Sequence, residues 1–146
     1  MIPPRRIITG LNADGQSCIL IDESSEMVMW STTGPKADNS HTTDAGGVPF
    51  TFPTNGTLLT YHDFPPGTGF DMHATDTIDY IIILSGQITF ITETGEVLAR
   101  AGDVIVDRGI MHGWRNDGDE ACRVVNILCP AIPVGKGATV SGTFGN

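Results

Sequence analysis

The chain has 146 residues, of which 40% are hydrophobic and 17% charged, and its formal net charge is −9. This length suits one domain with a hydrophobic core, and the apolar content excludes a disordered chain. The few basic residues are scattered, apart from Arg5 and Arg6, so we expect neither nucleic acid nor an anionic membrane as a partner.

Short β-branched segments separated by turn residues dominate the chain, and helical periodicity is almost absent. The predicted strands are 5–9, 17–22, 26–30, 58–64, 80–84, 87–92, 97–100, 104–107, 113–116 and 123–129. Pairs such as Thr94-Gly95 and Asp117-Gly118 supply turn chemistry between them. About ten strands joined by tight turns predict an all-β fold, an antiparallel sandwich or barrel.

We expect a single domain over residues 1–146, with N-terminal strands in 1–30, a long loop in 31–55, the barrel core in 56–130 and a flexible tail in 131–146. The loop has Val48, Phe50 and Phe52 as its apolar anchors and room for a short turn of helix. It either folds over one mouth of the barrel as a lid or is a plain surface excursion.

The chain carries no apolar run of about 18 residues, and its first ten residues lack the apolar stretch of a signal peptide. We therefore expect an intracellular, cytoplasmic protein. Its cysteines, Cys18, Cys122 and Cys129, form no Cys-x-x-Cys pair and no even disulfide set, so we interpret them as structural residues.

The chemically informative stretch runs from residue 67 to residue 116. Alternate residues of a strand face the same side, so His73 shares a face with Thr75, and His112 shares one with Trp114 and Asn116. Two histidine-bearing strands that face into one barrel would bring their imidazoles together.

This stretch resembles the two sequence motifs of the cupin superfamily. The residues that match the motifs are Gly67 or Gly69, His73, Asp79, Gly86, Gly102, Asp103, Gly109, His112 and Asn116. The resemblance implies a cupin-type antiparallel β-barrel, or jelly roll. It also implies a homodimer, in which segments 5–9 and 17–22 would pair across the interface and cover exposed sheet edges.

The departures from the motifs bear on function. The resemblance implies three histidines and a carboxylate around a divalent metal, but Thr75 stands in the second histidine position and Asp79 is shorter than the usual glutamate. Asp107-Arg108 replaces the proline turn. His73, His112 and Asp79 could still hold a metal (Fe, Mn, Ni or Zn) at a degenerate site, or no metal is bound.

Two further histidines could join such a site. His62 could supply a third imidazole if its strand turns that face inward, although a hydrogen-bonded structural or surface role is the more common one for such a residue. His41 could take part only if the long loop closes over the pocket.

The same residues can also act without a metal. A carboxylate beside an imidazole fixes its tautomer and raises its basicity, so His73 or His112 with Asp79 would be a general acid–base pair. Arg108, Tyr80 and Thr75 are candidates for polarising a substrate carbonyl.

Apolar side chains should line or pack the barrel around these groups. The predicted set is Met72, Ile81, Ile83, Ile88, Phe90, Val104, Val106 and Trp114. Those that face the cavity would favour a small apolar organic substrate, with Trp114 near His112.

Three functional hypotheses follow. The first is an enzyme of the isomerase, epimerase, dehydratase or decarboxylase type, which moves a proton on an apolar carbonyl metabolite, with secondary metabolism as its setting by analogy of fold. The second is a metal-dependent dioxygenase that uses His73, His112 and Asp79. The third is a non-catalytic barrel that binds a small molecule.

Overall fold

A computed structural model describes residues 1–134, which form eleven strands and no helix. The strands are β1 (Arg5–Leu11), β2 (Ser17–Ser24), β3 (Val28–Ser31), β4 (Leu58–Phe64), β5 (Gly69–His73), β6 (Thr77–Ser85), β7 (Gln87–Thr92), β8 (Glu96–Arg100), β9 (Val104–Asp107), β10 (His112–Arg115) and β11 (Cys122–Pro130). Their pairings are antiparallel, which confirms the predicted all-β class. Nothing in the described part of the chain is a helix long and apolar enough to span a lipid bilayer.

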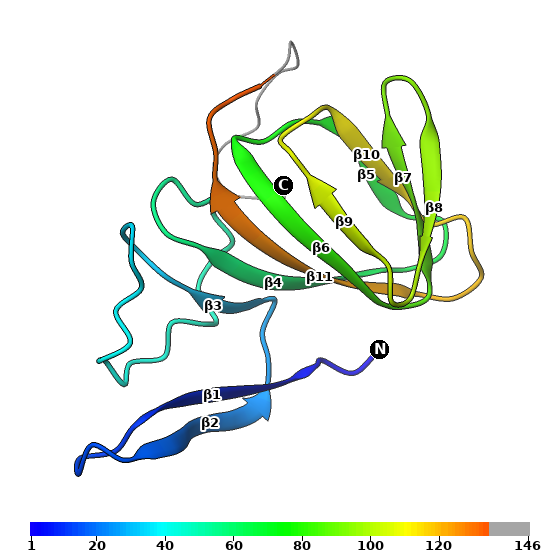
Figure 1. The fold of residues 1–146 in the computed structure, drawn as a ribbon. Coiled ribbons are helices and arrows are strands. Elements are labelled where there is room, and N and C mark those ends of the chain that lie inside the picture. The colour runs from blue at the N-terminus through cyan, green and yellow to red at the C-terminus, as the bar shows by residue number, and fades with distance from the viewer. Residues whose placement is uncertain (135–146) are drawn as a thin grey trace.

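Two sheets face each other and enclose the core (Figure 1). One has the strand order β3-β4-β11-β6-β9 and the other β5-β10-β7-β8, so the chain passes repeatedly from sheet to sheet. Because strand residues alternate between faces, Ile81 and Ile83 of β6 point inward and meet Ile88 and Phe90 of β7. This jelly-roll arrangement confirms the predicted barrel.

The hairpin β1–β2 forms a separate two-stranded sheet that stands away from the barrel (Figure 1). Arg6, 7% exposed, fastens it to the long loop, because its guanidinium donates to the carboxylates of Asp44 and Glu23 and to the Met29 carbonyl. The N-terminal region that we predicted for residues 1–30 therefore has two parts: the hairpin β1–β2 forms its own sheet, and β3 belongs to the five-stranded sheet. Pairing of the hairpin across a dimer stays a prediction.

The loop of residues 31–55 contains no helical turn, unlike our expectation. Its end does close one part of the barrel, because Phe50 and Phe52 pack edge to face at 5.2 Å and cover the buried cluster of Val28, Leu58 and Leu128. Both rings also line the cavity, while the interpretation of the loop as a lid over the barrel mouth stays a prediction. Of the flexible tail that we predicted for 131–146, residues 135–146 lie outside the described part of the chain.

Strand β5 was not predicted, because its surroundings are rich in glycine and proline. It pairs with β10 and brings Gly69 against the backbone of that strand. A Cβ atom built at Gly69 would lie 1.9 Å from the Trp114 carbonyl oxygen, so only glycine allows this approach. The glycine that reads as a strand breaker is here what permits the pairing.

Three residues predicted to line or pack the barrel point outward instead. Val104 and Val106 are 60% and 52% exposed, and Met72 is 38% exposed. The register of β9 on β6 places Asp107 opposite Asp79, and alternation then turns Ile105 and Asp107 inward.

Asn116, in the second motif, has a structural role. It is fully buried, its amide nitrogen donates to the carbonyls of Phe64 (2.8 Å) and Glu120 (2.9 Å), and its Oδ1 accepts from the Gly118 amide (2.9 Å). The side chain thereby joins the end of β4 to the turn between β10 and β11.

Candidate functional site

A cavity of about 80 Å³ lies inside the barrel, several times the roughly 10–15 Å³ that one water molecule needs. Its wall is mainly aromatic and aliphatic, with a few polar groups. It is lined by Met27, Phe50, Phe52, Thr60, Tyr61, His62, Phe64, Phe70, His73, Ile81, His112, Trp114, Val124, Asn126 and Leu128. Such a space suits a small, mainly apolar molecule held by a few polar contacts.

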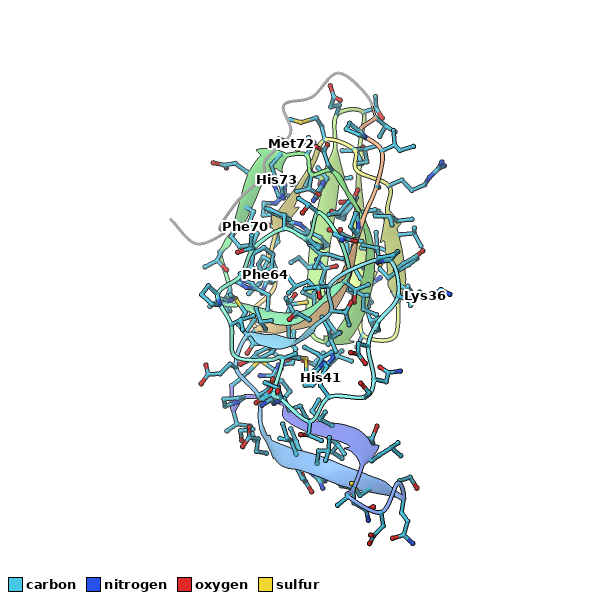
Figure 2. All side chains as sticks on the ribbon, turned by 90° about the vertical axis from the view of Figure 1, so that its left-hand side faces the viewer. Lys36, His41, Phe64, Phe70, Met72 and His73 are labelled. Carbon is cyan, nitrogen blue, oxygen red and sulfur yellow. The ribbon has the colours of Figure 1, made fainter. Side chains whose placement is uncertain are left out.

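His73 and His112 meet at this cavity, as the sequence predicted. They are register partners at the end of β5 and the start of β10, and their ring centroids lie 4.3 Å apart with the planes inclined by 54°. His112 is only 3% exposed and stacks on Phe90 at 5.3 Å. Figure 2 shows His73 with Phe70 and Phe64 at the side of the barrel.

Backbone carbonyls fix the tautomer of both rings. Nδ1 of His73 lies 2.7 Å from the Asp71 carbonyl oxygen, and Nδ1 of His112 lies 2.8 Å from that of Ile110. A carbonyl oxygen can only accept, so each Nδ1 carries the proton and donates it. In the neutral ring the lone pair then resides on Nε2, which is the nitrogen suited to accept a proton.

Asp107, and not Asp79 as the motif predicted, is the carboxylate that lies against the imidazole pair. It is 1% exposed, and its Oδ2 lies 3.0 Å from Nδ1 of His112. Its Oδ1 accepts from the amides of Gly109 and Ile110, which shapes the turn before β10. Because the His112 N–H is aligned with the Ile110 carbonyl, the contact with Asp107 is electrostatic.

Asp79 lies behind this pair in a hydrogen-bonded chain. The Thr77 hydroxyl donates to Asp79 (2.7 Å), Thr75 and Thr77 share a hydrogen bond of 2.8 Å, and the side chain of Asn126 also bonds Asp79. Asp79 interacts with His112 through charge. The direct carboxylate partner of the imidazole is therefore Asp107 and not Asp79.

Burial disfavours the charged forms of Asp79, Asp107 and His112. It raises the pKa of the Asp79 and Asp107 carboxyls and lowers the pKa of the His112 imidazole. Burial likewise lowers the pKa of His62. The neutral imidazole of His112 thus persists to lower pH than in an exposed histidine, which suits a proton acceptor.

The other predicted site residues divide into two groups. His62 and Trp114 line the cavity, where His62 packs at 4.6 Å on Phe64. Tyr80 is 40% exposed and Arg108 is exposed, and neither lines the cavity. Neither side chain is therefore placed to polarise a carbonyl group inside the cavity, and strand alternation sends Tyr80 to the face opposite Asp79.

Two more of the residues considered also lie off the cavity wall. Thr75 is buried but bonds Thr77. His41 stacks on Trp30 at 6.2 Å, close to the hairpin and well away from His73 (Figure 2).

The protein ligands for a metal ion are not assembled in the described part of the chain. No three histidine, cysteine, aspartate or glutamate side chains gather there in a group that could hold an ion. Asp79 is engaged by Thr77 and Asn126, and the Asp107 carboxylate faces Nδ1 of His112, the protonated nitrogen. Two imidazoles alone do not make the three-ligand set that a facial site requires.

Comparisons with known proteins agree with the fold. The Cupin_2 family (Cupin domain) matches residues 60–128. The chain is 30% identical over 164 residues to the Cupin-domain-containing oxidoreductase srdD of Neurospora crassa, covering 97% of this chain and 83% of that protein. It is 38% identical over 88 residues to the Phomopsin biosynthesis cluster protein D of Diaporthe leptostromiformis, covering 59% of this chain and 47% of that relative.

Among solved structures, an uncharacterized conserved protein with a double-stranded beta-helix domain from Klebsiella pneumoniae has a TM-score of 0.50 at 23% identity. The match covers 58% of this chain and 79% of that one, and it supports the fold. The chain spans about half the length of the phomopsin relative but most of srdD. With its two facing sheets and its motif residues in place, the chain belongs to the cupin superfamily.

Proposed function

We propose that this cupin is an enzyme that moves a proton at the carbon next to a carbonyl group of a small, mainly apolar metabolite. The observation that carries the proposal is the imidazole pair. His73 and His112 lie 4.3 Å apart at the cavity, and a backbone carbonyl holds each ring in the tautomer with its lone pair on Nε2.

The proposed reaction needs a base that removes a proton from the substrate and an acid that gives a proton back. His112 accepts the proton at Nε2 and becomes an imidazolium, while the electron pair of the broken C–H bond passes into an enolate. The carboxylate of Asp107, 3.0 Å from Nδ1, stabilises the imidazolium. Return of the proton to the same carbon, to a neighbouring carbon or to the opposite face gives exchange, isomerisation or epimerisation. If the enolate expels a hydroxyl group from the carbon β to the carbonyl, and this hydroxyl takes the proton and leaves as water, the enzyme is a dehydratase. In a decarboxylase the enolate forms differently: the C–C bond to a carboxyl group breaks, CO2 leaves, and an imidazolium then protonates the carbon.

The cavity wall supports an apolar substrate. Phe50 and Phe52 come from the long loop, and Phe70 and Trp114 come from the four-stranded sheet. Exclusion of water by these rings would protect an enolate from uncontrolled protonation. The phomopsin relative is named as a biosynthesis cluster protein, which supports small-molecule biosynthesis as the setting for this chain too.

The test is deuterium incorporation in heavy water, followed by NMR, with cyclohexanone and phenylacetaldehyde as enolisable probes. Wild-type protein should introduce deuterium next to the carbonyl above the buffer rate. His112→Gln should lose about 100-fold or more of that activity, since general base catalysis contributes about 10²–10⁴. His41→Gln, an exposed histidine away from the cavity, is the matched control and should retain the wild-type rate.

Wild-type exchange that survives in His112→Gln would refute the proposal. Tight binding of a probe without any exchange would favour the third hypothesis, a barrel that only binds its ligand.

An oxidoreductase is the second candidate, because the srdD relative that matches 97% of the chain carries that name. Protein purified without chelators should then contain near-stoichiometric iron, manganese, nickel or zinc, and His112→Ala should lose it. Proton exchange by metal-depleted protein at the undiminished rate would count against this candidate.

A further inference from the structure

One polar side chain of the cavity wall has an atom that the fold leaves without a partner. Oδ1 of Asn126 is buried and makes no hydrogen bond within the described residues, and Asn126 lines the cavity. It lies in the middle of β11, between the inward residues Val124 and Leu128. Thr60 of β4 and Ile81 of β6 are its register partners.

Packing alone does not explain an asparagine at this place. Asparagine is depleted in strands, and an apolar β-branched residue would fill an inward position of β11 without burying an unpaired acceptor. A buried polar atom without a partner lowers stability, so such an atom at a cavity wall points to a ligand that completes it.

The neighbours of Asn126 fix which end of its amide is left over. Asp79 bonds the side chain of Asn126, and a carboxylate accepts, so the amide nitrogen is the end that serves Asp79. The Thr77 hydroxyl donates to the same carboxylate, which keeps Asp79 in place. The end of the amide that is left without a partner is the carbonyl oxygen Oδ1, which can accept a hydrogen bond from an O–H or N–H group.

We propose that Asn126 is a specificity-determining residue whose Oδ1 accepts a hydrogen bond from a hydroxyl group of the substrate. The substrate class is then narrower than an apolar carbonyl compound: it is a hydroxylated one, with the hydroxyl directed to β11 and the enolisable carbon directed to His73 and His112. This inference rests on the proposed function for the carbonyl part, and on the orphaned acceptor for the hydroxyl part.

The test compares three ketones that differ at one position: 4-hydroxycyclohexanone, 4-methoxycyclohexanone and cyclohexanone. Affinities are measured by titration calorimetry, which does not depend on turnover. Wild-type protein should bind the hydroxylated ketone about tenfold more tightly than the other two, since a neutral hydrogen bond is worth about one factor of ten in affinity. The methoxy compound separates donation by the hydroxyl from mere size and polarity.

Variants at Asn126 assign the preference to its oxygen. In Asn126→Val the ratio of affinities should fall to about one, and in Asn126→Thr, which keeps a short oxygen acceptor, it should be intermediate. Asn39→Val makes the same change at an exposed asparagine and should retain the full preference. Thermal melts verify folding, and Asn126→Thr carries the test if Asn126→Val fails to fold.

Equal affinities of wild type for the three ketones, or no binding of any of them, would overturn the inference. So would a preference that survives in Asn126→Val. Hydroxyl preference without deuterium exchange would refute the proposed proton transfer and leave the role of Asn126 standing. Deuterium exchange without a preference for the hydroxylated ketone would refute the role of Asn126 and leave the proposed proton transfer standing.

Discussion

The carboxylate of Asp107 offers a sharp perturbation of the imidazole pair. Asp107→Asn removes the negative charge 3.0 Å from Nδ1 of His112, while the amide oxygen can still accept from the Gly109 amide. The new N–H group faces the ring and also disfavours the imidazolium. The Ile110 carbonyl still accepts from Nδ1, so the tautomer of the neutral ring is retained.

The magnitude follows from the distance. An opposite charge this close raises an imidazole pKa by about 1–3 units, and each unit corresponds to about 1.4 kcal/mol. Since the tautomer survives, we expect the lower part of this range. Deuterium exchange should slow by about 10- to 100-fold, and the acid limb of the pH–rate profile should move to lower pH.

The assay is the pH dependence of exchange followed by NMR, with Asp103→Asn as the control. Asp103 is also a turn aspartate that accepts a backbone amide, at 2.8 Å from the Arg100 nitrogen, but it is exposed. Its variant should behave as wild type. An Asp107→Asn rate within about twofold of wild type, or an acid limb that moves to higher pH, would refute the reasoning.

Three more outcomes are expected. Because burial lowers the pKa of His112, the acid limb of the wild-type pH–rate profile should have its midpoint below about 6.5, the ordinary pKa of histidine. A midpoint at or above about 6.5 would contradict the role of His112 as a neutral base. Asn116→Ala removes the three hydrogen bonds from this buried side chain to the backbone and should lower the free energy of unfolding by about 3 kcal/mol in urea titrations, whereas a loss under 1 kcal/mol would contradict its structural role. Gly86→Ala should destabilise more than Gly15→Ala, because both glycines have φ near +74° but only the Cβ at Gly86 would meet a backbone oxygen, that of Ala121 at 2.6 Å; equal changes in Tm would contradict this.

Much of the architecture could be predicted because strands alternate and turns have their own chemistry. The β-branched runs of the sequence indicate strands β6 and β11, and alternation along each strand gives the inward positions. The match of His73 and His112 to the two motifs, together with strand alternation, also predicted that their imidazoles would meet inside the barrel. Strand β5 was missed because the glycines that permit its close pairing with β10 read locally as turn signals.

The carboxylates of the site were harder to assign, because their roles depend on register between strands. Alternation alone could have shown that Asp79 and Tyr80, as neighbours on one strand, cannot both face the cavity. That Asp107 points inward, by contrast, follows only from its pairing opposite Asp79. Asn126 did leave a local signal, as the lone amide in the apolar run of β11, but its unpaired oxygen is visible only in three dimensions.

The most direct test of the account is a double-mutant comparison of deuterium incorporation into cyclohexanone. Rates would be measured for wild type, His73→Gln, His112→Gln and the double variant, each verified as folded by its thermal melt. If the two imidazoles act as one unit, either single change should remove nearly all of the exchange and the second change should add little. Rates near wild type in both single variants would contradict the central claim.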